Sequence, residues 1–182
     1  MFNLFNKKPT LKLAIVMRAI PGSGKSTFAH QIQAAAHAQG MTCTIHSSDE
    51  KFMVDGEYKF DQSLLGKYHH QNQDDFKRAA EAGTNVVIAD NTNIKRRDYM
   101  EYVLRAKDAG YKVVSITFVP GDAEMHFQRN VHSVPLEVVE KMKASLEATI
   151  ENTDFDERYT MECHTGMLES EYAKCIIKAV LA

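Results

Sequence analysis

The chain has 182 residues, of which 44% are hydrophobic and 25% are charged, and its formal net charge is −2. This length and composition predict one globular domain with a substantial core and leave too few residues for two ordinary domains. The slightly acidic balance excludes overall electrostatic attraction to nucleic acid, so a nucleic-acid partner would have to bind a local basic patch.

The expected location of the protein is the cytoplasm. Near the N-terminus the only apolar run, Leu13–Met17, is too short for a signal sequence or a membrane span. The cysteines (Cys43, Cys163 and Cys175) are odd in number and widely spaced, which favours reduced thiols over a disulfide framework or a zinc site.

Segments typical of strands and of helices alternate along the chain. Residues Leu11–Arg18 form a β-rich run that ends at a Pro-Gly turn, and the alanine-rich segment after it stops at Gly40, a residue that commonly follows a helix. The later strands are predicted at 42–47, 85–90 and 111–119, and the helices at 25–40, 62–83, 96–110, 122–130 and 135–152, with Pro135 as the first residue of the last helix.

Four strand–helix units in series predict an α/β fold. We expect a three-layer arrangement, in which a parallel sheet of four to five strands has helices on both faces. A single domain would span residues 1–182, with its core at about 11–150. The tail, 153–182, contains a candidate fifth strand (159–164) and a terminal helix (169–181), but its role stays open.

The segment Val16–His30, VMRAIPGSGKSTFAH, is the first candidate for a functional site. It matches the phosphate-binding pattern G-x-x-x-x-G-K-[ST] except at its first position, which is Ala19. Lys25 would reach the outer phosphates and Ser26 would ligate Mg²⁺. A negative φ at Ala19 would make its methyl group nearly free of cost, whereas a positive φ would cost about 1–2 kcal/mol. The residues expected to bind ATP are Pro21, Gly22, Ser23, Gly24, Lys25, Ser26 and Thr27.

Two carboxylates are expected at the same edge of the sheet, where ligands bind in open α/β folds. Asp49 follows the second strand and is a candidate base that accepts the proton of an attacking hydroxyl, with Glu50 as a competitor. Asp90 ends the third strand and is a candidate for holding the metal through water or orienting the acceptor. Each of the two aspartates has an ordinary structural alternative as a helix cap.

Arg129 lies between the two late helices, where small kinases carry a mobile lid over the phosphates. An arginine that reaches the γ-phosphate in the transition state is worth about 10³–10⁵ in rate. The alternative is an ordinary surface charge.

These motifs together resemble the polynucleotide-kinase-like group of P-loop ATPases. The resemblance rests on PGSGKST, SSDEKF, VVIADNTN and RNVHSVPLEVVEKM, in the order and approximate spacing of that group, and covers roughly Leu11–Ile150. It implies binding of ATP and Mg²⁺ by Lys25, Ser26 and Thr27, a base at Asp49, an acceptor-site carboxylate at Asp90 and a lid arginine at Arg129. The sequence departs from the group at two positions. Ala19 replaces the first glycine of the loop, and Phe52 lies where a phage member of the group has an arginine that contacts the acceptor's phosphate.

Three functions remain open from the sequence. A 5′-hydroxyl of DNA or RNA is the first acceptor considered, because Lys95, Arg96 and Arg97 form a basic cluster at the active edge, where Arg96 and Arg97 would bind the substrate. The alternatives are a small-molecule hydroxyl, which Phe52 and the acidic net charge favour, and a non-catalytic ATP-dependent switch.

Overall fold

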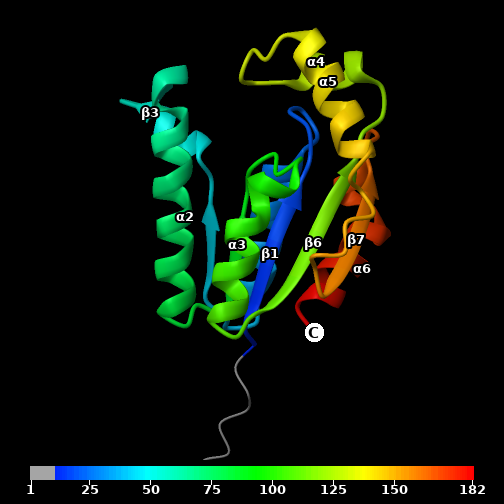
Figure 1. Ribbon diagram of the computed structural model, residues 1–182. Helices are drawn as coiled ribbons and strands as arrows, with labels where there is room; N and C mark the ends of the chain where they lie inside the picture. The colour runs from blue at the N-terminus through cyan, green and yellow to red at the C-terminus, as the bar shows by residue number, and fades with distance from the viewer. Residues whose placement is uncertain (1–10) are drawn as a thin grey trace, which may run out of the picture.

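Five parallel strands form the central sheet of the computed structural model, which describes residues 11–182 (Figure 1). Their spatial order is β2–β5–β1–β6–β7, so β1 occupies the centre. The N-terminal segment, in which no signal sequence is expected, includes residues 1–10, and these lie outside the described residues. The strands are β1 (Leu13–Arg18), β2 (Cys43–His46), β5 (Val86–Ala89), β6 (Lys112–Val119) and β7 (Glu157–Glu162).

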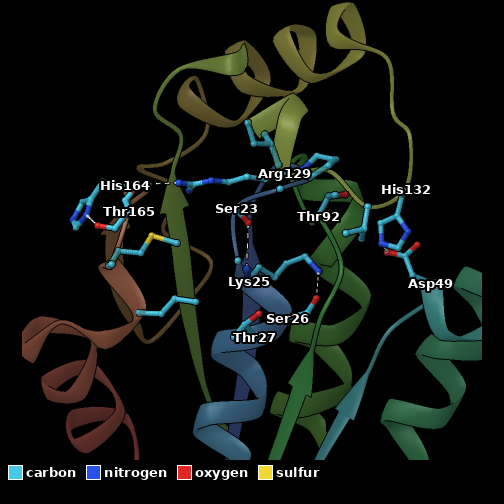
Figure 2. A pocket seen from close by; sticks show the side chains of 18 of the residues that line it. Ser23, Lys25, Ser26, Thr27, Asp49, Thr92, Arg129, His132, His164 and Thr165 are labelled. Atoms are coloured by element: carbon cyan, nitrogen blue, oxygen red, sulfur yellow. Dashed lines mark hydrogen bonds and ion pairs between the residues drawn. The ribbon is translucent and has the colours of Figure 1, made fainter. Parts of the chain in front are cut away.

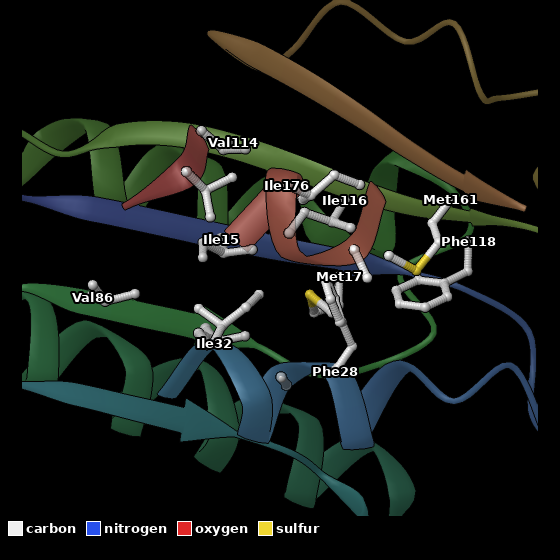
Figure 3. Close-up of a cluster of buried hydrophobic side chains, with 14 of the residues drawn as sticks. Ile15, Met17, Phe28, Ile32, Val86, Val114, Ile116, Phe118, Met161 and Ile176 are labelled. Atoms are coloured by element: carbon white, nitrogen blue, oxygen red, sulfur yellow. The ribbon is translucent and has the colours of Figure 1, made fainter. Parts of the chain in front are cut away.

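Helices cover both faces of this sheet, as the alternation of segments predicted. The helices are α1 (Lys25–Ala38), α2 (Leu65–Glu81), α3 (Arg96–Asp108), α4 (Ala123–Arg129), α5 (Leu136–Glu147) and α6 (Glu171–Val180). On one face, α1 and α6 pack against Ile15 and Met17 (Figure 3). On the other face, α2 and α3 pack against Ala14 and Val16. The central strand is therefore buried on both sides, which explains its continuous apolar sequence.

The tail completes the sheet. Strand β7 pairs with β6 in parallel, with Ile116 opposite Tyr159, and α6 buries Ile176 in the same core as α1. The fifth strand and the terminal helix expected within 153–182 are thus both present. The parallel sheet with two helical layers confirms the predicted three-layer α/β fold.

The polar segment between β2 and α2 contains structure that the sequence pattern did not predict. A 3₁₀ turn (Asp49–Phe52) leads into a small antiparallel hairpin of β3 (Met53–Val54) and β4 (Glu57–Tyr58). A second 3₁₀ turn (Gln62–Leu64) precedes α2, because the Asp61 side chain accepts a hydrogen bond from the Ser63 N–H there. Strands of two residues are too short to give a detectable alternation of polar and apolar positions.

The helices α4 and α5 lie over the carboxyl-terminal edge of the sheet (Figure 1). The fully buried Arg18, at the end of β1, donates hydrogen bonds to the carbonyls of Asn93 and Ile94 and to Thr149, just beyond α5. Pro135 has extended ψ and directly precedes the first helical residue of α5, so its predicted position was wrong by one residue.

Cys43, Cys163 and Cys175 are free thiols in the structure. Burial raises the pKa of Cys43 and of Cys163 to about 12, so both stay protonated at neutral pH. None of the helices between residues 11 and 182 combines the length and hydrophobicity that a bilayer span requires.

Candidate active site

The loop between β1 and α1 has the backbone of an anion-binding loop. Gly22 and Gly24 have left-handed φ angles of 76° and 83°, which glycine adopts at little cost. The first turn of α1 contains no acidic residue, so the positive end of its dipole faces the loop uncompensated. Ala19 is not among the positive-φ residues, so its methyl group adds little strain. The departure from the glycine pattern at this position therefore does not distort the loop.

Lys25 points from the start of α1 toward the end of β5. Its Nζ lies 2.6 Å from Asp90 Oδ1 and 3.2 Å from Ser26 Oγ, and both Lys25 and Asp90 are buried. The arrangement in Figure 2 shows the side chains of Lys25 and Ser26 side by side at the loop. Asp90 therefore fixes the lysine, but it is not itself among the residues that line the cleft.

A cleft of about 400 Å³ opens above the phosphate loop. It brings together three side chains that are far apart in the sequence, Lys25, Asp49 and Arg129 (Figure 2). The loop itself forms the floor of this cleft from Ile20 to Thr27. The tail segment 164–169 forms one wall, opposite Asp49 and His132.

Asp49 begins the 3₁₀ turn that follows β2. The backbone just before it is held by a chain of buried amide and phenol groups, in which the Ser48 N–H donates to Asn91 Oδ1 (2.9 Å) and Asn91 Nδ2 donates to the Tyr102 hydroxyl (3.1 Å). The carboxylate of Asp49 is partly exposed and lies 3.6 Å from Nε2 of His132, at Oδ2. A carboxylate fixed at its backbone yet open to the cleft has the access that a general base needs.

Arg129 ends α4 and extends across the cleft. Its Nη2 donates to Thr165 Oγ1 (3.1 Å), so α4 is joined to the tail wall (Figure 2). The same helix touches the phosphate loop, because a Cβ placed on Gly22 would lie 2.1 Å from the His126 carbonyl oxygen. His126 is fully buried, which lowers the pKa of its imidazole, and its Nε2 accepts from the Gly121 N–H. The backbones of α4 and of the phosphate loop are thus in contact.

The basic cluster at the start of α3 lies outside this cleft. Arg96 makes a bidentate ion pair with Asp154, through Nε (3.0 Å) and Nη2 (2.9 Å), in the segment before β7. Arg97 is exposed, with its Nε 3.7 Å from Asp98. Neither arginine lines the cleft, and the partner of Arg96 accounts for it without a substrate. Their predicted substrate-binding role has no support from their placement and stays a prediction.

Two groups of cleft residues escaped the sequence analysis. The first is the tail segment His164–Glu169, whose Met167 and Leu168 approach within 3.2–3.3 Å of a Cβ built on Gly24. Its only signal was Gly166, a glycine with positive φ between a strand and a helix. The second is His132 between α4 and α5, which lies in the RNVHSVP motif but has no distinguishing neighbour in sequence. Both groups reach the cleft through tertiary contacts between segments that are distant in sequence, which a sequence pattern does not show.

The loop fits the phosphates of ATP with Mg²⁺. A backbone from which a Cβ at Gly22 is excluded, a buried lysine and an exposed hydroxyl at Ser26 match the needs of a polyphosphate chain and a hard cation. Lys25 would hold the phosphates and Ser26 the metal. Bound Mg²⁺ would supply neutralisation of phosphate charge.

A family model and a known protein each match most of this chain. Residues 15–149 match the family model AAA_33, described as an AAA domain. Over 134 residues the chain is 33% identical to human NEDD4-binding protein 2; this stretch is 70% of the chain but only 7% of that much longer protein.

Solved structures share the fold at low identity. A chain of the Pnkp1/Rnl/Hen1 RNA repair complex matches with a TM-score of 0.64 and 20% identity, covering 82% of this chain and 49% of that one. A gluconokinase from Sinorhizobium meliloti 1021 matches with a TM-score of 0.59 and 17% identity, covering 94% and 92%. The Mycobacterium tuberculosis APS kinase CysC, in complex with AMPPNP and APS, matches with 0.57 and 16%, covering 96% and 100%.

Proposed function

Because this chain belongs to the AAA_33 family of AAA domains, we propose that it is an ATP-dependent kinase that phosphorylates a hydroxyl group. The observation that carries the proposal is the single cleft shared by Lys25, Asp49 and Arg129. A phosphate-binding loop alone would suit a motor, a switch or a kinase. A partly exposed carboxylate in the same cleft supports phosphoryl transfer, since nucleotide binding by itself requires no base.

In the proposed reaction, the acceptor oxygen attacks the γ-phosphorus of ATP. A new oxygen–phosphorus bond forms as the bond to the β–γ bridging oxygen breaks, and the electron pair of that bond leaves with ADP. The hydroxyl proton passes to the Asp49 carboxylate. Lys25 leaves Asp90 to hold the phosphates, and Arg129 leaves Thr165 to stabilise charge on the transferred group.

The acceptor favoured by this proposal is the 5′-hydroxyl of a polynucleotide. Support comes from the combined motifs of the phosphate loop, DNTN and RNVHSVP, and from the likeness in fold to a chain of an RNA repair complex. Lys95 and Arg97 are exposed at the start of α3 and would add affinity for backbone phosphates. Free thiols are consistent with a cytoplasmic location, which we include in the proposal.

A small-molecule acceptor is the second candidate, and one observation favours it. Phe52 is 1% exposed, so the position that would provide a cation for a nucleic-acid phosphate provides a buried ring instead. The likeness in fold to a gluconokinase and to APS kinase is compatible with this alternative.

The test is transfer of label from γ-labelled ATP, with Mg²⁺, to 5′-hydroxyl oligonucleotides, nucleosides and small metabolites. Label in oligonucleotides supports the first candidate, and label only in metabolites supports the second. Lys25→Ala is expected to abolish transfer, and Asp49→Asn to lower kcat by about 10²–10⁴ with little change in ATP affinity.

Matched controls are available on the exposed surface, in Lys178→Ala and Asp108→Asn, both of which should transfer at the wild-type rate. A fully active Asp49→Asn would remove the base assignment. Binding of ATP without transfer to any acceptor would leave only the switch.

A further inference from the structure

Phe52 is the centre of an aromatic cluster beside the active site. Its ring centroid lies 4.8 Å from that of Tyr68 on α2, 5.1 Å from Phe60 and 6.0 Å from Tyr58 on β4. Tyr58 and Tyr68 meet it edge to face, the arrangement that aromatic pairs prefer. The buried Phe52 thus holds the small hairpin in place and fixes the position of Tyr58.

Tyr58 in turn contacts the lid. Its ring lies 4.4 Å from that of His132, at an interplanar angle of 44°. His132 Nε2 lies 3.6 Å from Asp49 Oδ2, as Figure 2 illustrates, and its Nδ1 is buried without a hydrogen-bond partner among the described residues. Burial and the nearby Asp49 carboxylate raise the pKa of Tyr58 to about 12, so its ring is neutral at working pH. Two rings from different elements therefore meet beside the proposed base.

Apolar side chains adjoin the ring pair on both of its elements, in addition to the Asp49 carboxylate. Lys51, the nearest cation in sequence to Phe52, pairs with Asp75 of α2 at 2.5 Å and is not among the residues that line the cleft. The hairpin exposes Met53 and Val54, and the lid exposes Val131 next to His132. A small polyol acceptor would need several hydrogen-bonding side chains here, whereas a planar base needs faces on which to stack.

We propose that Tyr58 and His132 are specificity-determining residues that hold the planar base of the acceptor's 5′-terminal nucleoside. This inference rests on the proposed function and specifies its substrate. In the terminal nucleoside, one sugar joins the nucleobase to the 5′-oxygen, and His132 of the ring pair lies directly beside Asp49. Stacking of the nucleobase on the ring pair would therefore bring the 5′-oxygen to the Asp49 carboxylate. Recognition would then depend on the terminal ring and tolerate any of the bases, since each has a π-face.

The experiment compares two 5′-hydroxyl oligonucleotides that differ only at the first position, one with a base and one with an abasic tetrahydrofuran. The wild-type protein should show kcat/KM about 5- to 150-fold lower on the abasic oligonucleotide, the range expected for one lost stacking contact. Tyr58→Leu and His132→Leu should lose a similar factor on the base-bearing oligonucleotide and little more on the abasic one. Tyr58→Phe, which keeps the ring, should lose less than Tyr58→Leu.

Tyr172→Leu is the matched control, because Tyr172 is an exposed aromatic residue on α6, outside the cleft. It should leave the ratio between the two oligonucleotides unchanged. Equal wild-type rates on both oligonucleotides would overturn this inference and leave the proposed function intact, as would an equal loss on both for Tyr58→Leu. No transfer by the wild type to either oligonucleotide would overturn the polynucleotide acceptor and this inference together. The wild-type comparison needs no variant and so does not depend on how a variant folds.

Discussion

Replacement of Gly22 by alanine tests the contact between the phosphate loop and α4. Two costs follow from the structure. A φ of 76° in an alanine costs about 1–2 kcal/mol of stability. The new Cβ would also lie 2.1 Å from the His126 carbonyl oxygen, short of an ordinary carbon–oxygen contact by about 1 Å. Because the Cβ is held rigidly by its own backbone and the carbonyl oxygen is a backbone atom, α4 or the loop must move by a comparable distance.

That displacement should lower the rate of phosphoryl transfer by moving Arg129, which lies at the end of the same short helix. A misplacement of about 1 Å costs roughly 10²-fold in rate, so we expect a fall in kcat of this order together with weaker ATP binding. The assays are urea denaturation for stability, calorimetry for ATP and label transfer for turnover.

Gly40→Ala separates the two costs. Gly40 has nearly the same φ, 74°, but a Cβ there would meet nothing within 4 Å. This variant should lose about 1–2 kcal/mol of stability and no activity. If Gly22→Ala were no less stable than Gly40→Ala and bound ATP normally, the contact between α4 and the loop would have no energetic weight, and the reasoning would fail.

Three further predictions concern other parts of the molecule. Ala19→Gly should leave ATP affinity nearly unchanged, since Ala19 has no positive φ to relieve, and a large gain by calorimetry would contradict this. Arg129→Ala should depress kcat more than the KM for ATP, and a change in KM alone would argue against the lid role. Burial lowers the pKa of His46 from 6.5 to about 4, so between these values the unfolded chain binds a proton that the folded chain does not, and stability is lost as pH falls. On going from about pH 7.5 to pH 5, wild type should lose about 2 kcal/mol more stability in urea than His46→Gln, and equal losses would refute the assignment.

Much of the fold followed from local patterns. The continuous apolar strands, the glycines at helix ends and the Pro-Gly turn after β1 act within a few residues, so the strand–helix order and the three-layer α/β class were predictable. The hairpin β3–β4 was not, because strands of two residues have no periodicity and depend on the packing of Phe52 against Tyr58 and Phe60.

The phosphate-binding loop and the two strand-end aspartates were predictable from the sequence alone, because glycine conformation and strand direction are local properties. The sequence left undecided which residues meet above that loop. The tertiary structure alone showed that Lys25 pairs with Asp90 and that Arg96 pairs with Asp154. It also brought His132 and the tail segment 164–169 to opposite walls of one cleft. The two ion pairs join residues 65 and 58 positions apart in the sequence. The walls of the cleft depend on how α4, α5 and the tail pack over the sheet, for which no short stretch of sequence contains the information.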